Sequence, residues 1–167
     1  MPETANDDAL LHIVLVTPEI PQNTGNIGRL CVGLEATLHL VHPLGFDITE
    51  KRVRRAGLDY WPHLKLRFHA DLGAFFDWAE GRRLHLFSSS GAAGTYTELD
   101  YVAGDVLVFG RESDGLPDDL LATEPSHVIP MTGPTRSLNL ANAVAVVAYE
   151  AMRQVRPQLF CSDERSR

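Results

Sequence analysis

Short runs of apolar and β-branched residues recur along the chain and alternate with segments that have the spacing of helices. The apolar runs predict strands at residues His12–Thr17, Thr37–His42, Leu64–Phe68, Leu84–Ser88, Val106–Phe109 and His127–Ile129. The helical patterns predict helices at residues Asn26–Glu35, Thr49–Leu58, Asp71–Glu80, Asp118–Leu121 and Leu138–Val155. Because the strands read as continuous apolar runs, we expect an α/β fold: a mostly parallel sheet with helices on both faces.

Two of these helices have recognisable start signals. Asp47, three residues before Glu50, can form a capping box, and Ser137 precedes the final apolar run. From Leu140 to Ala148 this run is apolar on nearly every face, which predicts a helix buried all round. Its small residues suit either a core helix or a helix that faces another subunit.

Length and composition describe an ordinary globular protein. The chain of 167 residues, 44% hydrophobic and 22% charged, predicts one domain over residues 1–167 with a core from about 11 to 155. No segment supplies the ~20 apolar residues of a membrane helix. The first eight residues lack the pattern of a secretory signal, and two cysteines, Cys31 and Cys161, are too few for a disulfide framework. We therefore expect a reduced, cytoplasmic protein.

The net charge of -7 argues against broad attraction to nucleic acid, although it can conceal a local basic patch. The one basic cluster is Lys51, Arg52, Arg54 and Arg55. It is either a track for RNA phosphates or a solvated helix face. Tyr60 and Trp61 follow the cluster, and they either stack on an exposed base or pack against the core.

Candidate chemistry gathers in three loops rich in Gly, Pro, Asn and Ser, each placed after a predicted strand. They read PEIPQNTGNIG from Pro18, GRESDGLP from Gly110 and PMTGPTRSLN from Pro130. Ligands of open parallel sheets bind at the carboxyl ends of the strands, so the site is expected there. The sequence has no dinucleotide fingerprint, P-loop or nucleophile elbow, and its histidines are scattered, so no metal site is predicted.

The first of these loops has two interpretations. The stretch from Asn23 to Asn26 opens a predicted helix, where free N–H groups and the helix dipole favour a phosphate. Alternatively, Asn23 or Asn26 only caps that helix. Arg29, about one turn further on, can project beside the helix entrance toward a phosphate.

Three segments together resemble the SPOUT class of RNA methyltransferases. They are PEIPQNTGNIGRLC from Pro18, VLVFGRESDGLP from Val106 and IPMTGPTRSLNLANAVAVVAYEAMRQ from Ile129, in matching order and spacing. Within the class the chain is similar to the small tRNA ribose 2′-O-methyltransferases that modify the wobble cytidine or uridine, and the segment KRVRRAGLDYW strengthens this likeness. The resemblance covers His12 to Arg153.

The resemblance implies a trefoil knot near the C-terminus and S-adenosylmethionine as cofactor. It also implies a homodimer that binds the tRNA anticodon arm through Lys51, Arg52, Arg54 and Arg55. The family's cofactor positions fall on Phe87, Gly110, Ile129, Ser137 and Leu138. Its catalytic positions fall on Arg29, Asn23, Glu112 and Asn139.

Two features qualify this interpretation. Relatives are thought to use the arginine as a base, but a guanidinium stays protonated in proteins, so we expect Arg29 to anchor the RNA phosphate beside the target ribose. Relatives often carry a basic residue where this chain has Asp114, which weakens RNA attraction there.

An alternative is a flavodoxin-like carrier that binds FMN, which fits the acidic composition and the Thr-Gly-Asn loop. Another is a catalytically idle RNA-binding relative.

Overall fold

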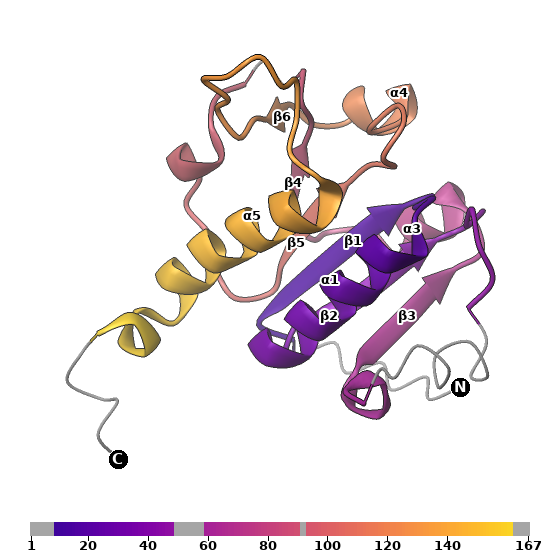
Figure 1. The fold of residues 1–167 in the computed structure, drawn as a ribbon, viewed down its shortest axis with the longest axis horizontal. Helices are drawn as coiled ribbons and strands as arrows, with labels where there is room; N and C mark the ends of the chain where they lie inside the picture. Colours follow the sequence, from indigo (N-terminus) through magenta and orange to yellow (C-terminus); the bar gives the residue numbers. More distant parts are fainter. Residues whose placement is uncertain (1–8, 49–58, 91–92, 162–167) are drawn as a thin grey trace.

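The computed structural model describes residues 9–48, 59–90 and 93–161. In this part of the chain six parallel strands form one sheet in the order β3-β2-β1-β5-β4-β6 (Figure 1). The strands are β1 (Leu11–Val16), β2 (Thr37–Val41), β3 (Lys65–His69), β4 (Leu84–Phe87), β5 (Asp105–Phe109) and β6 (Ser126–His127). The α-helices are α1 (Pro21–Leu34), α3 (Leu72–Ala79), α4 (Asp118–Leu121) and α5 (Leu140–Val155). Short 3-10 helices are η1 (Trp61–His63), η2 (Tyr96–Glu98) and η3 (Pro157–Phe160).

The sheet is covered on both faces, as the apolar strand patterns predict. Along β1, Leu11, Ile13 and Leu15 belong to one core cluster with residues of α1 and α5. Val14 and Val16 point the other way, into a cluster with residues of α3 and α4. This alternation is the two-residue period of a strand, and both sets are buried. The predicted α/β fold is confirmed, whereas the predicted helix at 49–58 lies outside the described residues, as does Glu50 of its capping box.

Helix α1 begins five residues earlier than its sequence predicts. Pro21 occupies the first turn, where its fixed φ suits a helix and its missing N–H leaves no donor unpaired. The N-cap is Ile20, whose side chain cannot cap. Asn23 therefore lies inside the helix, and the expectation that Asn23 or Asn26 caps it is wrong.

Helix α5 is buried on one face only, so the expectation of a helix buried all round is wrong. Val144, Val147 and Ala148 are fully buried. Tyr149 is 50% exposed, and Asn142, seven residues earlier, is exposed on the same side. The N-cap is Asn139, whose Oδ1 accepts from Ala141 N at 3.0 Å, and not Ser137. The exposed side leaves room for the second of the two roles expected of this helix, contact with another subunit.

The chain around β6 passes between two parts of one loop. On one side, the His127 carbonyl accepts a hydrogen bond of 3.1 Å from Ser88 N. On the other side, the Ser126 carbonyl accepts one of 3.1 Å from Ala93 N, and Val128 exchanges backbone hydrogen bonds with Gly94 and Tyr96. Residues 126–128 are thus flanked by the segment that leaves β4 and by the segment that leads to η2.

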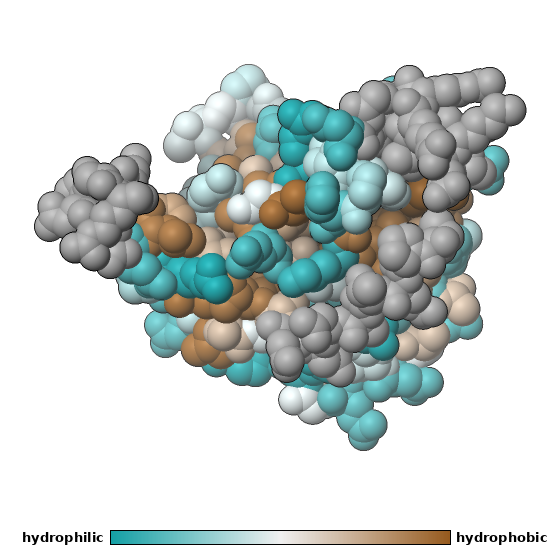
Figure 2. Space-filling model, turned by 90° about the horizontal axis from the view of Figure 1, so that it is seen from below, coloured by the Kyte–Doolittle hydropathy of each residue, from teal (hydrophilic) through white to brown (hydrophobic). Residues whose placement is uncertain are grey.

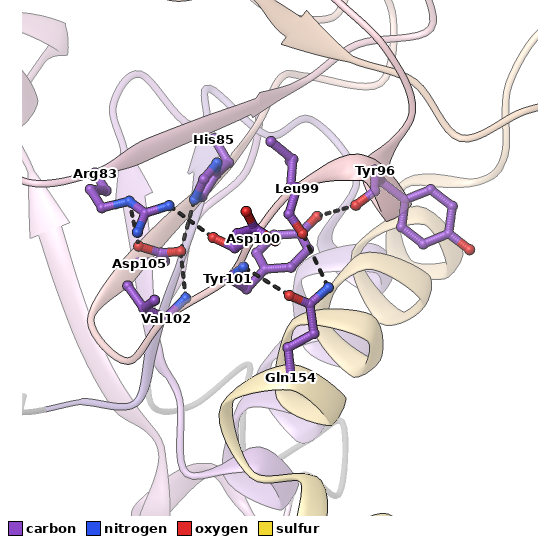
Figure 3. A network of polar contacts seen from close by, with 9 residues as sticks. All are labelled: Arg83, His85, Tyr96, Leu99, Asp100, Tyr101, Val102, Asp105 and Gln154. Carbon is purple, nitrogen blue, oxygen red and sulfur yellow. Dashed lines mark hydrogen bonds and ion pairs between the residues drawn. The ribbon is translucent and has the colours of Figure 1, made fainter.

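A polar network ties α5 to the amino-terminal ends of β4 and β5 (Figure 3). The buried Asp105 carboxylate accepts from His85 Nε2 at 2.8 Å and from Val102 N at 2.9 Å. Gln154 of α5 accepts from Tyr101 N at 3.0 Å and donates to Leu99 O at 3.1 Å. The network lies at the opposite end of these strands from the three loops, so it anchors the helix without entering the expected site.

Three buried histidines form a row across β1, β2 and β3. His12 Nδ1 lies 3.0 Å from His39 Nε2, and His39 Nδ1 lies 3.0 Å from His69 Nε2. Trp78 packs against all three rings. Burial, followed by the nearby rings and the Arg67 and Arg82 charges, holds the pKa of His39 well below its ordinary value. His39 is therefore neutral at pH 7 and serves as a core residue.

Candidate active site

A cavity of about 390 Å³ opens at the carboxyl ends of β4, β5 and β6, where the strand-end rule predicts the site. All three Gly- and Pro-rich loops contribute to its walls. Its lining includes every residue expected to bind the cofactor: Phe87, Gly110, Ile129, Ser137 and Leu138. It also includes Asn23, Glu112 and Asn139, three of the four expected catalytic residues. Residues remote in sequence are thus brought to one place.

The floor of the cavity is aromatic. The rings of Phe87 and Phe109 stack with centroids 5.0 Å apart and planes 20° from parallel. Ile129 and Leu138 add aliphatic surface to the walls. Apolar surface of this kind suits a planar heteroaromatic ring better than a polar sugar.

The loop after β5 is closed into a tight turn. Arg111 and Gly115 exchange two backbone hydrogen bonds, of 3.0 and 3.1 Å, and Gly115 has a φ of +78°. A Cβ on Gly110 would lie 1.9 Å from the Gly115 carbonyl carbon. Glycine is therefore required at position 110, because any side chain would collide with the backbone that closes the turn.

The Glu112 carboxylate binds the start of α1. It accepts from the backbone N–H of Glu19 at 2.8 Å and of Ile20 at 3.2 Å, and from Asn23 Nδ2 at 3.0 Å. An anion is therefore supplied at this helix start by the protein itself, as the Glu112 carboxylate. Asn139 Nδ2 donates to Asn23 Oδ1 at 3.0 Å, so the series Glu112–Asn23–Asn139 joins all three loops.

Arg29 stands apart from this series. Its side chain is 68% exposed, and it is absent from the described residues that line the cavity. Its Nη2 lies 3.7 Å from Asp59 Oδ1, and its Cζ lies 5.0 Å from the centre of the Tyr60 ring. The guanidinium is thus presented to solvent, beside one carboxylate and one aromatic face.

Several other predicted residues can now be placed. Trp61 packs against the core, as one of the two alternatives for this aromatic pair expects. Asp114 forms an ion pair with Arg111 at the cavity rim, so part of its charge is compensated locally. The expected RNA-binding residues Lys51, Arg52, Arg54 and Arg55 lie outside the described residues.

Sequence reasoning missed some of the cavity wall. Ser88 and Ser89 line the cavity, and the signal was available because Ser88 ends a predicted strand and Ser89 directly follows it. His127 also lines it, with a buried Nδ1 that has no hydrogen-bond partner among the described residues. Burial, and to a smaller extent the neighbouring His85, lowers the pKa of His127. Glu19, which accepts from Ser113 N and Oγ at 3.0 Å, gave no recognisable signal.

Among the residues that the structure describes, no group of three or more His, Cys, Asp or Glu side chains has the geometry of a metal site. Within the same residues, none of the helices combines the length and apolar character needed to cross a bilayer.

The cavity fits S-adenosylmethionine in size and chemistry. Its volume lies within the ~300–1,000 Å³ of small-molecule sites. The stacked phenylalanines and Ile129 provide an apolar slot for an adenine, and the unpaired His127 Nδ1 is a polar atom in the wall. Ser137 and the backbone on either side of Gly110 offer hydrogen-bonding groups for the polar parts.

Comparison with known proteins identifies the family of this chain. Residues 10–149 match the SpoU rRNA Methylase family. A tRNA (cytidine(34)-2'-O)-methyltransferase of Burkholderia cenocepacia is 45% identical over 150 residues, which cover 87% of this chain and 96% of that protein. The enzyme of the same description from Escherichia coli (strain K12) is 44% identical over 149 residues, covering 87% and 94%.

Two solved structures are also similar. One, described as giving structural insights into the 2-OH methylation of C/U34 on tRNA, has a TM-score of 0.82 and 50% identity, covering 88% of this chain and 97% of that one. The SpoU methyltransferase AviRb from Streptomyces viridochromogenes, in complex with the cofactor AdoMet, has a TM-score of 0.75 and 27% identity, covering 91% and 60%. The family match over most of the chain, together with the cavity built from its three loops, shows that this protein belongs to the SpoU family of methyltransferases.

Proposed function

We propose that this protein transfers a methyl group from S-adenosylmethionine to the ribose 2′-hydroxyl of the wobble nucleotide of tRNA, a cytidine or uridine at position 34. The observation that carries the proposal is the series Glu112–Asn23–Asn139, which joins three loops around one cavity. Relatives with this specificity match the chain over 87% of its length. The alternative of an FMN-binding electron carrier is wrong, because the chain belongs to a methyltransferase family.

The cavity residues would orient the cofactor. Phe87, Ile129 and Leu138 would hold the adenine, and Gly110 and Ser137 would bind through backbone and hydroxyl groups. The bound cofactor supplies an electrophilic methyl group on a sulfonium, so the protein needs no nucleophile of its own. Its remaining task is to hold the ribose 2′-hydroxyl in line with that methyl group and to assist loss of the hydroxyl proton.

Arg29 is assigned to the RNA in this mechanism. It presents a fork of N–H donors to solvent and already lies beside one carboxylate, which supports a role in binding an anion. We propose that Arg29 anchors the phosphate next to the target ribose, and that this phosphate assists proton loss. Asn23, Glu112 and Asn139 then hold the loops that frame the reacting atoms.

The path of the chain at β6 supports a trefoil knot. Residues 126–128 pass between Ser88 on one side and residues 93–96 on the other, and α5 follows directly after the next loop. We propose that this passage is the knot of the SPOUT class. Its effect would be to place Ile129, Ser137 and Leu138 against Gly110, through crossing segments that support one another.

A homodimer is the proposed assembly. The exposed face of α5 carries Tyr149, whose ring packs at 88° to Phe160 of η3 with centroids 6.3 Å apart. Leu159 beside them is 55% exposed. Figure 2 shows apolar surface reaching solvent at the end of the molecule that carries η3. Adjacent exposed aromatic and aliphatic side chains are typical of protein interfaces.

A dimer would also help an acidic protein to bind tRNA. One chain carries a net charge of -7, which opposes tRNA. We propose that Lys51, Arg52, Arg54 and Arg55 of both chains bind the anticodon arm, so that two local basic clusters act together. We propose that the protein acts in the cytoplasm, where tRNA is available as its substrate.

The function is tested with the purified protein, S-adenosylmethionine carrying a labelled methyl group, and an unmodified tRNA anticodon stem-loop. Nuclease digestion and mass spectrometry are expected to find one methyl group on the ribose of nucleotide 34. The matched control is the same stem-loop with deoxyribose at that nucleotide, which offers no acceptor hydroxyl. Methylation of the deoxy substrate, or none of either substrate by protein that binds the cofactor, would refute the proposal. The second result would instead favour a catalytically idle RNA-binding protein.

A further inference from the structure

The segment that precedes β3 packs on the face of α1 that carries Arg29. Gly28 is the contact point: a Cβ built there would lie 3.2 Å from Leu64 Cδ2 and 3.5 Å from the rings of Tyr60 and Trp61. Trp61 also reaches the main core cluster. The segment is therefore held against α1 by its own packing, and it approaches closely at position 28.

Tyr60 contacts the helical turn of Arg29 at two points. Its hydroxyl donates a hydrogen bond to the Gly25 carbonyl, the oxygen that α-helical geometry pairs with the Arg29 N–H. Its ring lies under the Arg29 guanidinium, with Cζ 5.0 Å from the ring centre. One side chain thus holds both the backbone turn that carries Arg29 and the charged end of its side chain.

Asp59 completes the surroundings of Arg29. The distance of 3.7 Å between Arg29 Nη2 and Asp59 Oδ1 is longer than a hydrogen bond, so the carboxylate neutralises charge without occupying a specific N–H donor. Both side chains are largely exposed, at 68% and 87%. Exposed ion pairs of this kind are weak and are screened by salt. A phosphate can therefore replace the carboxylate, while the ring contact persists.

We propose that Tyr60 is a positioning residue for Arg29, and that Asp59 holds, in the free protein, the place beside Arg29 that an RNA phosphate takes. The proposal rests on the proposed function, because it deepens the role assigned there to Arg29. When RNA binds, its phosphate displaces the Asp59 carboxylate from Arg29, while Tyr60 keeps the Arg29 side chain in place. Asp59 therefore opposes RNA binding, and Tyr60 favours it.

The first test replaces the carboxylate. Asp59→Asn removes a competitor for Arg29, so we expect the KM for the anticodon stem-loop to fall about twofold to fivefold with kcat unchanged. Asp77→Asn is the matched control, since it makes the same change in net charge at an exposed position on α3, across the sheet. Equal effects of the two variants would show a general charge effect and overturn the role of Asp59. An unchanged KM in Asp59→Asn would do the same.

The second test is a double-mutant cycle on stem-loop affinity. Tyr60→Leu removes both contacts and is expected to weaken binding about fivefold in the native background and not at all in Arg29→Ala. Tyr60→Phe keeps the ring and is expected to restore at least half of that loss on a logarithmic scale. Equal losses in both backgrounds, or a Phe variant as weak as Leu, would overturn the positioning role.

Cofactor binding separates the two proposals. Calorimetry with S-adenosylmethionine reports whether each variant is folded with an intact cavity, and we expect the same affinity in all of them. If the native protein binds the cofactor but neither binds nor methylates the stem-loop, the proposed function fails. If it does both and the cycle shows no coupling between Tyr60 and Arg29, only the present inference fails.

Discussion

The Glu112 carboxylate accepts a hydrogen bond of 3.0 Å from the Asn23 amide, across 89 residues of sequence. The same carboxylate accepts from the backbone N–H of Ile20, the N-cap of α1, whose own side chain makes no capping hydrogen bond. Asn23 in turn accepts a hydrogen bond from the side chain of Asn139, the N-cap of α5. The starts of the two helices on one face of the sheet are thereby set relative to each other by a single acidic side chain. These contacts indicate that Glu112 organises the loops around the cavity.

Glu112→Gln is expected to reduce both stability and turnover. The amide keeps one acceptor oxygen where the carboxylate has two, so at least one donor at the start of α1 loses its partner. Loss of charge-assisted hydrogen bonds predicts a decrease in the free energy of unfolding of about 1–3 kcal/mol. Thermal melting measures this, with the exposed Glu124→Gln as the control. We expect kcat to fall more than cofactor affinity, and calorimetry that finds the reverse would place Glu112 in the cofactor pocket.

Gly110→Ala is expected to open the loop after β5. The added Cβ would overlap the Gly115 carbonyl, so the turn cannot close without backbone movement. We predict a loss of about 3 kcal/mol or more in stability and loss of cofactor binding. Gly33→Ala is the matched control, because nothing lies within 4 Å of its Cβ position and alanine favours a helix interior. A Gly110→Ala protein that binds the cofactor as the native one does would contradict this account.

The sheet and the location of the site could be predicted from sequence, because strand periodicity and the strand-end rule are local. The start of α1 could not, since its cap comes from Glu112 in a distant loop. The exposure of Tyr149 could not be predicted either. An apolar residue on α5 can be buried in the core or in contact with another subunit, and the sequence pattern does not distinguish the two. The pairing of Arg29 with Asp59 also depends on how a remote segment docks.

The row of buried histidines predicts acid sensitivity. His39 and His69 have lowered pKa values in the folded protein, chiefly from burial. Below the ordinary histidine pKa of about 6.5, His39 is protonated in the unfolded chain but stays neutral in the folded protein. Stability is therefore full above that pH and falls below it, by up to about 1.4 kcal/mol per pH unit from His39 until its lowered folded-state pKa is reached, and His69 contributes in the same direction. Denaturant unfolding between pH 7.5 and 5 should show a shallower decline for His39→Asn than for the native protein, and equal declines would exclude His39 as the cause.

The outer face of α5 provides a direct test of the proposed dimer. Tyr149 is half exposed and packs on Phe160, so an arginine there would place a charge within the apolar face while removing little from the core. We expect light scattering to give twice the single-chain mass of 18.4 kDa for the native protein and 18.4 kDa for Tyr149→Arg. Leu121→Arg introduces the same charge at a partly exposed leucine on α4 and should leave the dimer intact. If Tyr149→Arg remains dimeric while folded, the subunits must meet through another surface.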